Sequence, residues 1–480
     1  MVAPWAAAAS PTQLDPSFNG DGLVTLHPVT GDRVLADMAV LKHGKTMVLV
    51  LTRDDPAFEL HRLRQNGTPD PVFGGGDGVF AFGPAADYDD VHLAVDPHSG
   101  KAYVSAVLDD GTTQVTTVWR IENNGTSDSS YGDSGTGQVT FGDRHTRALL
   151  ALPGGLLVMA GADLAAHTAA VWRLDDAGDP DPGFGSDGTA VLSSNQNDEV
   201  TGLARQSYDK VVVTGDHLDA TASKLRAYRL TKSGALDPSF SGDGRATIAP
   251  SSHGVTTTRV WTPQVVVRPD NRTVFVAGLS QNDGSSLRTL FAAGLTRAGA
   301  PDPAFVQHVY SSLSETSGHT ALERDGKLVT AGFVSSNGGT GDAVIRLTTT
   351  GHLDPSWSRD GILPLTGTSE LISLGITSYG RVEVGRTMGT GPFDTEVRAL
   401  RGTPTPTCHG DLATQFGSGR NDTINGTAHA DVLVGLDGDD VLKGLAGDDV
   451  ICGNADDDTL IGGSGTDELL GGPGRDDLRP

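Results

Sequence analysis

Seven aspartates between residues 417 and 478 recur at a constant step of nine residues. A glycine precedes each Asp by five positions, and a large aliphatic residue follows it by two. Glycine lets a short loop turn its carbonyl groups inward, and Ca²⁺ prefers carboxylate and carbonyl oxygens as ligands. The spacing therefore suits repeated cation-binding loops, each followed by a short strand that points its aliphatic side chain inside.

The pattern reads G-G-x-G-x-D-x-U-x, where U is a large aliphatic residue, and it resembles the RTX, or hemolysin-type, calcium-binding repeat. This resemblance implies a parallel β-roll with two nonapeptides per coil. It also implies that each ion lies between the loops of successive coils and takes one Asp from each. The residues that it assigns to calcium binding are Asp422, Asp431, Gly435, Asp437, Gly438, Asp440, Gly444, Gly447, Asp449, Gly453, Asp458, Gly462, Gly463, Gly465, Asp467, Gly471, Gly472, Gly474 and Asp476.

The carboxylates of this stretch are dense and would repel one another without a cation, so we expect its folding to depend on calcium. A disordered linker rich in Gly and Asp is the alternative, but chance would not keep the three residue types in phase through seven copies. The copies are unequal, because Arg420, His429 and Asp456 stand where glycine is expected. The best sites are therefore predicted from Gly435 onward. Acids directly before the motif Asp, such as Asp448, are expected to point outward as solvated charge.

The chain has two cysteines, Cys408 before the nonapeptides and Cys452 inside the fourth copy. The resemblance to the RTX tails of secreted bacterial proteins implies a disulfide between them that holds the start of the roll. Two free buried thiols are the alternative, and two cysteines alone cannot form a thiolate zinc site. The same resemblance implies a secreted, extracellular protein with Ca²⁺ as its cofactor.

The net charge of −25 is shared by the whole chain, with −11 in residues 403–480 and −14 in the remainder. A chain this acidic is a poor ligand for nucleic acid and for anionic lipid. No run of eighteen apolar residues occurs, so no transmembrane helix is expected. Residues 1–12 are apolar and alanine-rich, which resembles the end of a signal peptide without its basic segment; an ordinary chain terminus is the alternative.

A second, longer repeat occupies the rest of the chain. Its core motif, Asp-Pro-Ser-Phe or a close variant, occurs seven times at steps of 52 to 65 residues. Between the motifs, short β-rich segments alternate with Gly, Asp and Asn turns, which predicts four antiparallel strands per unit and no helix. A period of this length indicates a propeller or a solenoid. The motif aspartates are Asp15, Asp70, Asp128, Asp181, Asp237, Asp302 and Asp354.

Over residues 14–401 this pattern resembles the delta-60 repeat, whose consensus contains L-D-x-S-F-G-x-D-G. Seven four-stranded units predict a seven-bladed β-propeller, since radial closure removes exposed sheet edges; an array of β-sandwiches is the alternative. The predicted fold is therefore all-β. Its expected parts are a signal-peptide remnant at residues 1–12, the propeller at 13–402 and the β-roll at 403–480.

An arginine precedes the motif Asp by eight residues in five units, as Arg62 precedes Asp70, whereas Gly294 takes this place in the fifth unit. A feature repeated in nearly every blade is normally part of the architecture. We therefore expect an ion pair that fixes the turn into the next blade. The recurrent aromatic residue of the motif is expected to pack as a wedge between blades rather than to stack on a sugar.

The sequence contains no convincing catalytic motif. Gly132-Asp133-Ser134-Gly135 resembles the loop around the nucleophile of chymotrypsin-like proteases, but it falls in the turn of the third motif and lacks the matching His and Asp context. The propeller histidines are scattered and form no ligand spacing. We therefore expect a calcium-binding protein without catalysis, whose propeller is a rigid scaffold for an extracellular protein or glycan. A propeller hydrolase or lyase is the alternative, and the long fifth unit, at residues 251–253 and 281–283, is where its site is best sought.

Overall fold

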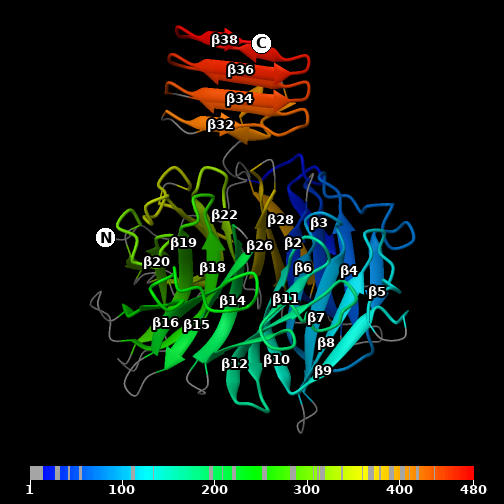
Figure 1. The fold of residues 1–480 in the computed structure, drawn as a ribbon. Coiled ribbons are helices and arrows are strands. Elements are labelled where there is room, and N and C mark those ends of the chain that lie inside the picture. Colours follow the sequence, from blue (N-terminus) through cyan, green and yellow to red (C-terminus); the bar gives the residue numbers. More distant parts are fainter. Residues whose placement is uncertain are drawn as a thin grey trace. The chain divides into compact units, whose positions relative to one another are not determined.

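The structure is a computed structural model, shown in Figure 1. The described residues are 14–26, 33–41, 44–52, 57–109, 114–132, 135–193, 198–207, 209–218, 223–250, 257–281, 288–305, 307–310, 313, 319–336, 339–358, 360–365, 372–377, 380–388, 394–400, 406–409, 411–417, 421–436 and 438–480. Strands and turns make up this described part, which includes no α-helix and hence no helix able to cross a membrane. The all-β class predicted from the sequence is confirmed.

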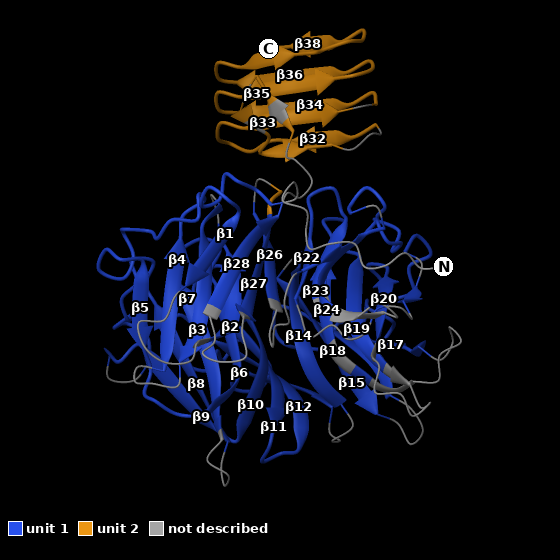
Figure 2. Cartoon of the chain, turned by 180° about the vertical axis from the view of Figure 1, so that it is seen from behind, with its two compact units in different colours: residues 1–377, 382–400 blue, residues 378–381, 401–480 orange. Residues whose placement is uncertain are grey.

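The chain forms two compact units (Figure 2). The larger contains residues 1–377 and 382–400, and the smaller contains residues 378–381 and 401–480. The segment expected to be a signal-peptide remnant, residues 1–12, lies outside the described residues.

Seven four-stranded antiparallel sheets form the larger unit, which confirms the predicted seven-bladed propeller. In six blades the strands follow the chain from the innermost to the outermost, and the innermost strands of neighbouring blades contact one another around the ring. The first three of these blades are β2 (Arg33–Val40), β3 (Thr46–Thr52), β4 (Phe58–Leu63) and β5 (Val79–Phe82); β6 (Tyr88–Val95), β7 (Ala102–Asp109), β8 (Gln114–Ile121) and β9 (Gln138–Gly142); and β10 (Arg144–Ala151), β11 (Leu157–Asp163), β12 (Thr168–Leu174) and β13 (Thr189–Ser193). The next three are β14 (Asp198–Gln206), β15 (Lys210–Leu218), β16 (Ser223–Leu230) and β17 (Arg245–Ile248); β18 (Thr257–Val267), β19 (Thr273–Gln281), β20 (Arg288–Leu295) and β21 (His308–Tyr310); and β22 (Thr320–Leu322), β23 (Leu328–Ser336), β24 (Gly339–Leu347) and β25 (Ile362–Pro364).

The seventh blade joins the two ends of the propeller chain. It contains β26 (Ile372–Ile376), β27 (Val382–Met388) and β28 (Asp394–Leu400), and its outermost strand is β1 (Leu23–Leu26), which pairs antiparallel with β28. The strand that follows each motif turn therefore belongs to the preceding blade. This offset corrects the expectation that each sequence repeat folds into a sheet of its own. Its physical consequence is closure of the ring by backbone hydrogen bonds between distant segments.

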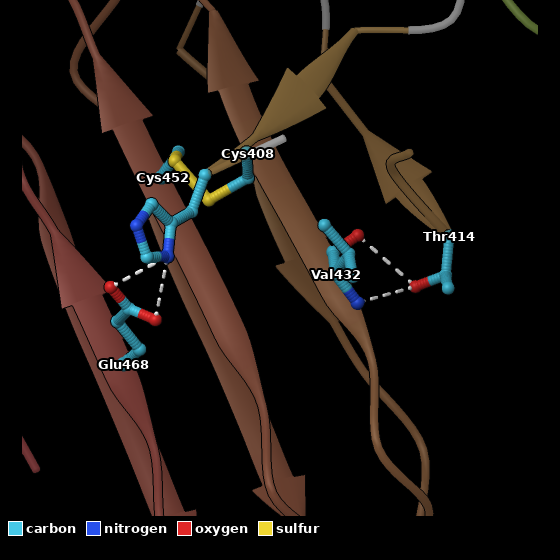
Figure 3. Close-up of a disulfide and its surroundings, with 6 residues drawn as sticks. Cys408, Thr414, Val432, Cys452 and Glu468 are labelled. Carbon is cyan, nitrogen blue, oxygen red and sulfur yellow. Dashed lines mark hydrogen bonds and ion pairs between the residues drawn. A yellow bond between two sulfur atoms is a disulfide. The ribbon is translucent and has the colours of Figure 1, made fainter. Parts of the chain in front are cut away.

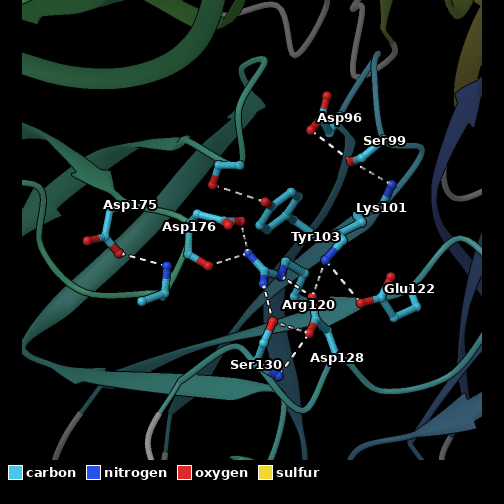
Figure 4. Close-up of polar contacts among 12 residues, drawn as sticks. Asp96, Ser99, Lys101, Tyr103, Arg120, Glu122, Asp128, Ser130, Asp175 and Asp176 are labelled. Carbon is cyan, nitrogen blue, oxygen red and sulfur yellow. Dashed lines mark hydrogen bonds and ion pairs between the residues drawn. The ribbon is translucent and has the colours of Figure 1, made fainter.

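The predicted arginine–aspartate pair is confirmed, and it also links neighbouring blades. Arg120 donates from Nε to Asp128 Oδ2 at 2.6 Å and from Nη1 to the carbonyl oxygen of Asp176, in the next blade, at 2.6 Å (Figure 4). Its guanidinium lies 4.5 Å from the ring centroid of Tyr131, the buried motif aromatic, and Lys101 Nζ lies 2.7 Å from the same Asp128 oxygen. The motif aromatic is therefore part of a contact between blades. The same stacking recurs for Arg62 on Phe73, Arg173 on Phe184, Arg229 on Phe240 and Arg346 on Trp357.

The fifth blade replaces this arginine with one from another strand. A Cβ at Gly294 would lie 2.7 Å from Cβ of Phe305, the motif aromatic. Arg268, directly after β18, lies with its guanidinium 5.3 Å from the Phe305 ring and donates to the carbonyl oxygen of Thr349, in the next blade, at 2.8 Å. Arg268 thus makes the contact with the motif aromatic and with the next blade that the arginine eight residues before the motif Asp makes in other blades.

Two parallel sheets form the roll, which confirms the predicted second fold. One contains β31 (Gln415–Phe416), β33 (Val432–Leu436), β35 (Val450–Asn454) and β37 (Glu468–Leu470), and the other contains β32 (Thr423–Asn425), β34 (Val441–Ala446), β36 (Thr459–Ser464) and β38 (Asp477–Arg479). Leu442 pairs with Leu460, so one coil contains 18 residues, or two nonapeptides. The motif aliphatics form the core between the sheets, where Ile424, Leu433, Leu442, Ile451 and Leu460 are buried.

A short hairpin, β29 (Thr407–Cys408) and β30 (Asp411–Leu412), precedes the roll. A disulfide joins Cys408 to Cys452 in β35, with their Cα atoms 5.7 Å apart (Figure 3). Neighbouring strand residues point to opposite faces, so Cys452 faces away from the core that holds Ile451. Buried Ala413 and Val434 join the two cysteines in a second small apolar cluster on that face.

Candidate metal centre

The motif aspartates of successive coils are joined by a ladder of hydrogen bonds. The backbone N–H of Asp431 donates to Oδ1 of Asp449, one coil later, at 2.8 Å. The parallel pairing of the coils repeats this contact and stacks the carboxylates above one another along each edge of the roll. The same bond joins Asp422 to Asp440, Asp440 to Asp458, Asp449 to Asp467 and Asp458 to Asp476.

The second carboxylate oxygen of the central aspartates has no hydrogen-bond partner. Asp440, Asp449 and Asp458 are each 1% exposed, and the Oδ2 atom of each is buried and unpartnered within the described structure. Burying a charged oxygen without a partner is costly, and native proteins normally avoid it. These three oxygens therefore indicate that a cation completes the roll.

Backbone carbonyls of the next coil lie beside these oxygens. A Cβ at Gly417 would lie 2.5 Å from the carbonyl oxygen of Gly435 and 2.9 Å from Asp422 Oδ2. The equivalent positions in the next four copies are bordered by the same two kinds of oxygen. The first glycine of each copy therefore leaves a space between a carboxylate and a carbonyl of the following coil. These spaces lie at Gly417, Gly426, Gly435, Gly444 and Gly453.

The electrostatics of the central carboxylates oppose ionisation. Burial raises the pKa of Asp440 to about 6; the Asp422 N–H bond acts in the opposite direction, and the charges of Asp458 and Asp422 add to the rise. Burial and stacked carboxylates likewise raise the pKa of Asp449 and of Asp458. A cation between the coils would reverse these effects, because it would supply the missing positive charge and a coordination partner for the unpartnered oxygens.

The donor set fits calcium. Asp440, Asp449 and Asp458 would hold an ion together with the carbonyl oxygens of the following coil, and an all-oxygen set with several carbonyls suits Ca²⁺. No group of three or more His, Cys, Asp or Glu side chains in the described part could hold a metal by itself. Backbone carbonyls must therefore supply much of the coordination, as the Gly-rich loops allow. Calcium would contribute charge neutralisation there, and the chain's own residues position the oxygens.

The seven copies differ in how complete this arrangement is. Asp431 has its hydrogen-bond partners within its own copy, because its Oδ2 accepts the N–H and the hydroxyl of Thr427 at 2.6 and 2.9 Å. In the last coil, the spaces beside Gly462 and Gly471 are bordered by Asp467 and Asp476 atoms without a described carbonyl from a further coil. The predicted ligand Asp437 and the substituted position Arg420 lie outside the described residues.

The second and fourth glycines of the motif let the coils stack closely. A Cβ at Gly463 would collide with the carbonyl oxygen of Leu445, and Gly463 has a φ of +113°. In earlier copies the second position is held at positive φ by Leu436, Leu445 and Asn454, at 87°, 78° and 76°. Positive φ is unfavourable for a residue other than glycine. Leu436, Leu445 and Asn454 therefore keep this backbone conformation because the packing of neighbouring coils imposes it. Gly438, Gly447, Gly465 and Gly472 also have positive φ, and a Cβ at Gly465, Gly472 or Gly474 would collide with a carbonyl oxygen of the preceding coil.

A second ladder runs beside the first and was not apparent in the sequence. Asp448 is exposed, as expected, but its Oδ1 also accepts the N–H of Thr466, one coil later, at 2.8 Å. Asp457 accepts in the same way from Arg475 at 2.8 Å. These acids therefore fix the residue directly before the next motif Asp, and the expectation that they are only solvated charge is corrected. The reason is the parallel register, which brings each of them beside a free N–H of the neighbouring loop.

The tempting propeller positions fall largely outside the described part of the chain. This holds for Asp133 and Ser134 of the protease-like turn, and for residues 251–253 and 282–283 of the fifth unit. The structure does bring together histidines that look scattered in the sequence, since His92 and His319 occupy equivalent positions of the innermost strands. Their signal in sequence is weak because each comes from a different blade.

Solved structures resemble the propeller at low sequence identity. The β-propeller domain of the Trilobed protease from Pyrococcus furiosus is 10% identical, covers 77% of this chain and 94% of its own, and has a TM-score of 0.41. The polysaccharide lyase Uly1 is 8% identical, with 78% and 90% covered and a TM-score of 0.46. The AfRom2 CNH domain is 9% identical, with 78% and 98% covered and a TM-score of 0.43. These likenesses concern the fold alone.

No curated protein matches the chain significantly. Two family models match parts of it. The model of the RTX calcium-binding nonapeptide repeat (4 copies) matches residues 416–451 and 444–478, and that of the DUF5122 β-propeller, a domain of unknown function, matches residues 206–240 and 323–356. The chain therefore combines a β-roll whose sequence matches the RTX calcium-binding repeat with a seven-bladed β-propeller of which two stretches match the DUF5122 β-propeller model.

Proposed function

We propose that this chain is a secreted calcium-binding protein whose roll folds when it meets extracellular calcium. The observation that carries the proposal is the set of buried, unpartnered Oδ2 atoms of Asp440, Asp449 and Asp458. Without a cation these carboxylates favour an open chain, and with one they become part of the fold. Calcium is far more abundant outside the cell than inside, so sites of modest affinity would fill only after export.

The proposal assigns the propeller the role of a rigid binding scaffold without catalysis. Its blades are held by internal contacts of the Arg120–Asp128 kind, which need no ligand. The expected partner is an extracellular protein or glycan. A rigid ring suits such a role because loops and axis residues from several blades keep fixed relative positions.

Calcium titration of the full chain tests the calcium part of the proposal. The protein is freed of calcium with a chelator and titrated with Ca²⁺, while circular dichroism and mapped limited proteolysis follow each unit. We expect residues 403–480 to be cleaved without calcium and protected with it, and the propeller to be protected throughout. Mg²⁺ is the matched control, because it demands a small octahedral shell and retains its water. An unchanged cleavage pattern together with no heat of calcium binding would refute the proposal.

A further inference from the structure

One strand position at the propeller axis differs in kind between the blades. In the first five blades a β-bulge interrupts the innermost strand. The position in question is the first residue after that bulge that pairs again with the second strand. Bulges re-aim side chains and are common beside functional sites. The equivalent residues of the seven blades, opposite Leu49, Ser105, Ala160, Thr214, Val276, Ala331 and Gly385, are Asp37, His92, Ala148, Gly202, Gln264, His319 and Ser373.

The ring formed by this position has a polar side and a small-residue side. Blades three and four carry Ala148 and Gly202 at this position. The sixth, seventh, first and second blades, which are neighbours around the ring, carry His319, Ser373, Asp37 and His92 in that order. We call these four residues the axis arc. Architecture repeats from blade to blade, so a departure confined to one side of the ring is a better candidate for a site than the repeated Arg–Asp pairs.

A hydrogen-bond chain fixes the orientation of His319. Buried Asp37 accepts the N–H of Leu93 at 2.8 Å and the N–H of Met38 at 2.7 Å, and the hydroxyl of Ser373 donates to it at 3.1 Å. The Ser373 oxygen lies 2.7 Å from His319 Nδ1. Because the Ser373 proton points to Asp37, Nδ1 of His319 must be the donor. When the His319 ring is uncharged, Nε2 is therefore its hydrogen-bond acceptor.

His92 completes the axis arc without adding positive charge. Its Nε2 atom is buried and has no hydrogen-bond partner in the described structure. Burial lowers the pKa of His92 more than the charges of Asp37 and Asp90 raise it, so the ring is neutral at pH 7. The axis arc thus contains one buried carboxylate, the neutral imidazole of His92 and the imidazole of His319. The side chain of His319 is 36% exposed, so its ring meets solvent at the axis.

We propose that the axis arc is the ligand site of the propeller and that it takes an ammonium group. An ammonium offers three hydrogen-bond donors and no acceptor, which complements the His319 Nε2 acceptor beside the charge of Asp37. The net charge of −14 on residues 1–402 favours a cation over an anion. A free polyamine and a lysine side chain of a partner peptide share this chemistry. The inference rests on the proposed role of the propeller as a binding scaffold, and not on calcium binding by the roll.

Calorimetric titration of the full chain with spermidine and, separately, with Nα-acetyl-lysine amide tests the inference. Each titration is run with and without calcium, so that failure of the roll and failure of the axis site are told apart. We expect binding in both conditions, a loss of about tenfold or more in affinity for His319→Ala, and a loss of a few fold for Ser373→Ala, which frees the His319 ring. His98→Ala, which removes an exposed histidine of the β6–β7 turn, is the matched control and should bind as the unaltered chain does.

Three results would overturn the assignment. They are no binding of either probe at millimolar concentration, equal affinity for His319→Ala and the unaltered chain, and binding of Zn²⁺ that requires both His92 and His319 while the amines do not bind. If His319→Ala fails to fold, ¹⁵N-histidine NMR of the unaltered chain decides the matter. We expect the His319 Nε2 to be unprotonated and to shift on adding spermidine; a proton on Nε2 in the free protein contradicts the site.

Discussion

The propeller and the roll both bury the motif aspartate in most of their repeats, yet they satisfy it in opposite ways. In the propeller, Asp128 receives the Arg120 guanidinium at 2.6 Å and the Lys101 ammonium at 2.7 Å. In the roll, Asp449 receives a single backbone N–H, from Asp431, and its other oxygen has no partner. The propeller thus neutralises its buried aspartate with arginine and lysine side chains of the same chain. The described part of the roll has no such side chain beside Asp449 Oδ2, and a bound ion would take that role. The same residue type at the same burial makes one unit self-sufficient and the other dependent on a ligand.

The pKa shifts follow the same division. Burial raises the pKa of Asp70 and of Asp354. The hydrogen bonds from Lys45 and Ser356, together with the charges of Arg62 and Arg346, lower these pKa values by more, so both lie below the usual range. In the roll, burial and stacked carboxylates raise the pKa of Asp440 to about 6. The difference comes from topology. An antiparallel blade places an arginine eight residues upstream beside its aspartate, whereas a parallel roll stacks each aspartate on its own equivalents.

Neutralising one carboxylate in each unit should give the largest contrast. Asp128→Asn leaves the Arg120 guanidinium buried with a weaker partner, and we expect the propeller to lose roughly 3–5 kcal/mol of unfolding free energy. Asp449→Asn removes a charge that repels its neighbours, so without calcium the roll should be as stable as before or more so. With calcium, the midpoint of its response should rise several-fold. Denaturant unfolding with a chelator, and calcium titration followed by circular dichroism, measure the two effects.

Ser130→Ala is the control for the propeller variant, because it alters the same turn without removing the charge of Asp128. Equal destabilisation of both units in the absence of calcium would mean that the roll aspartates are already compensated within the chain, as those of the propeller are. So would a calcium midpoint that Asp449→Asn does not change.

A fall in pH should move the two units in opposite directions. The folded pKa of Asp440, about 6, lies above its ordinary value, so the calcium-free roll binds protons more tightly when folded and gains stability as the pH falls from 7 through 6. Asp70 and Asp354 have lowered pKa values, so their contribution is complete at neutral pH and is lost only below their ordinary range. Between pH 7 and pH 5 the calcium-free roll should therefore become more stable. The propeller should lose some stability over the same range, because the pKa of buried His92 is lowered and the unfolded chain therefore binds that proton more tightly. Protons and calcium also compete, so the calcium midpoint should be higher at pH 5.

Mapped limited proteolysis with a chelator at several pH values checks this expectation for the roll, because residues 403–480 should be cleaved more slowly as the pH falls. Thermal unfolding follows the propeller over the same range. A roll that loses stability between pH 7 and pH 5 in the presence of a chelator would show that the buried carboxylates are already compensated.

The smallest predicted effect concerns the second ladder of the roll. Asp448→Ala removes the acceptor for the Thr466 N–H and should raise the calcium midpoint by about two- to threefold, in line with the loss of one exposed hydrogen bond. Asp448→Asn keeps an acceptor oxygen and should leave the midpoint close to that of the unaltered chain. Equal shifts for the two variants would mean that the charge, and not the hydrogen bond, is what matters at this position.

Much of the architecture could be predicted from the sequence because it depends on the spacing of residues within short segments. The nine-residue step from Asp440 to Asp449 specifies a coil, and the aliphatic residue two positions later specifies its core. The eight-residue step from Arg120 to Asp128 specifies an ion pair within one blade. Such features depend on strand period and turn length, which a short segment determines by itself.

Other features were decided only by the folded chain. The pairing of β1 with β28, the use of Arg268 in place of an arginine at Gly294, and the second ladder at Asp448 all join segments whose relation no local spacing reveals. The axis arc is the clearest case, because His319 and Asp37 meet only when the ring has closed. Side chains from separate blades converge at the axis because radial packing brings every innermost strand there. In the sequence each of these residues stands alone, far from the others and outside any motif, so no local pattern predicts that they meet.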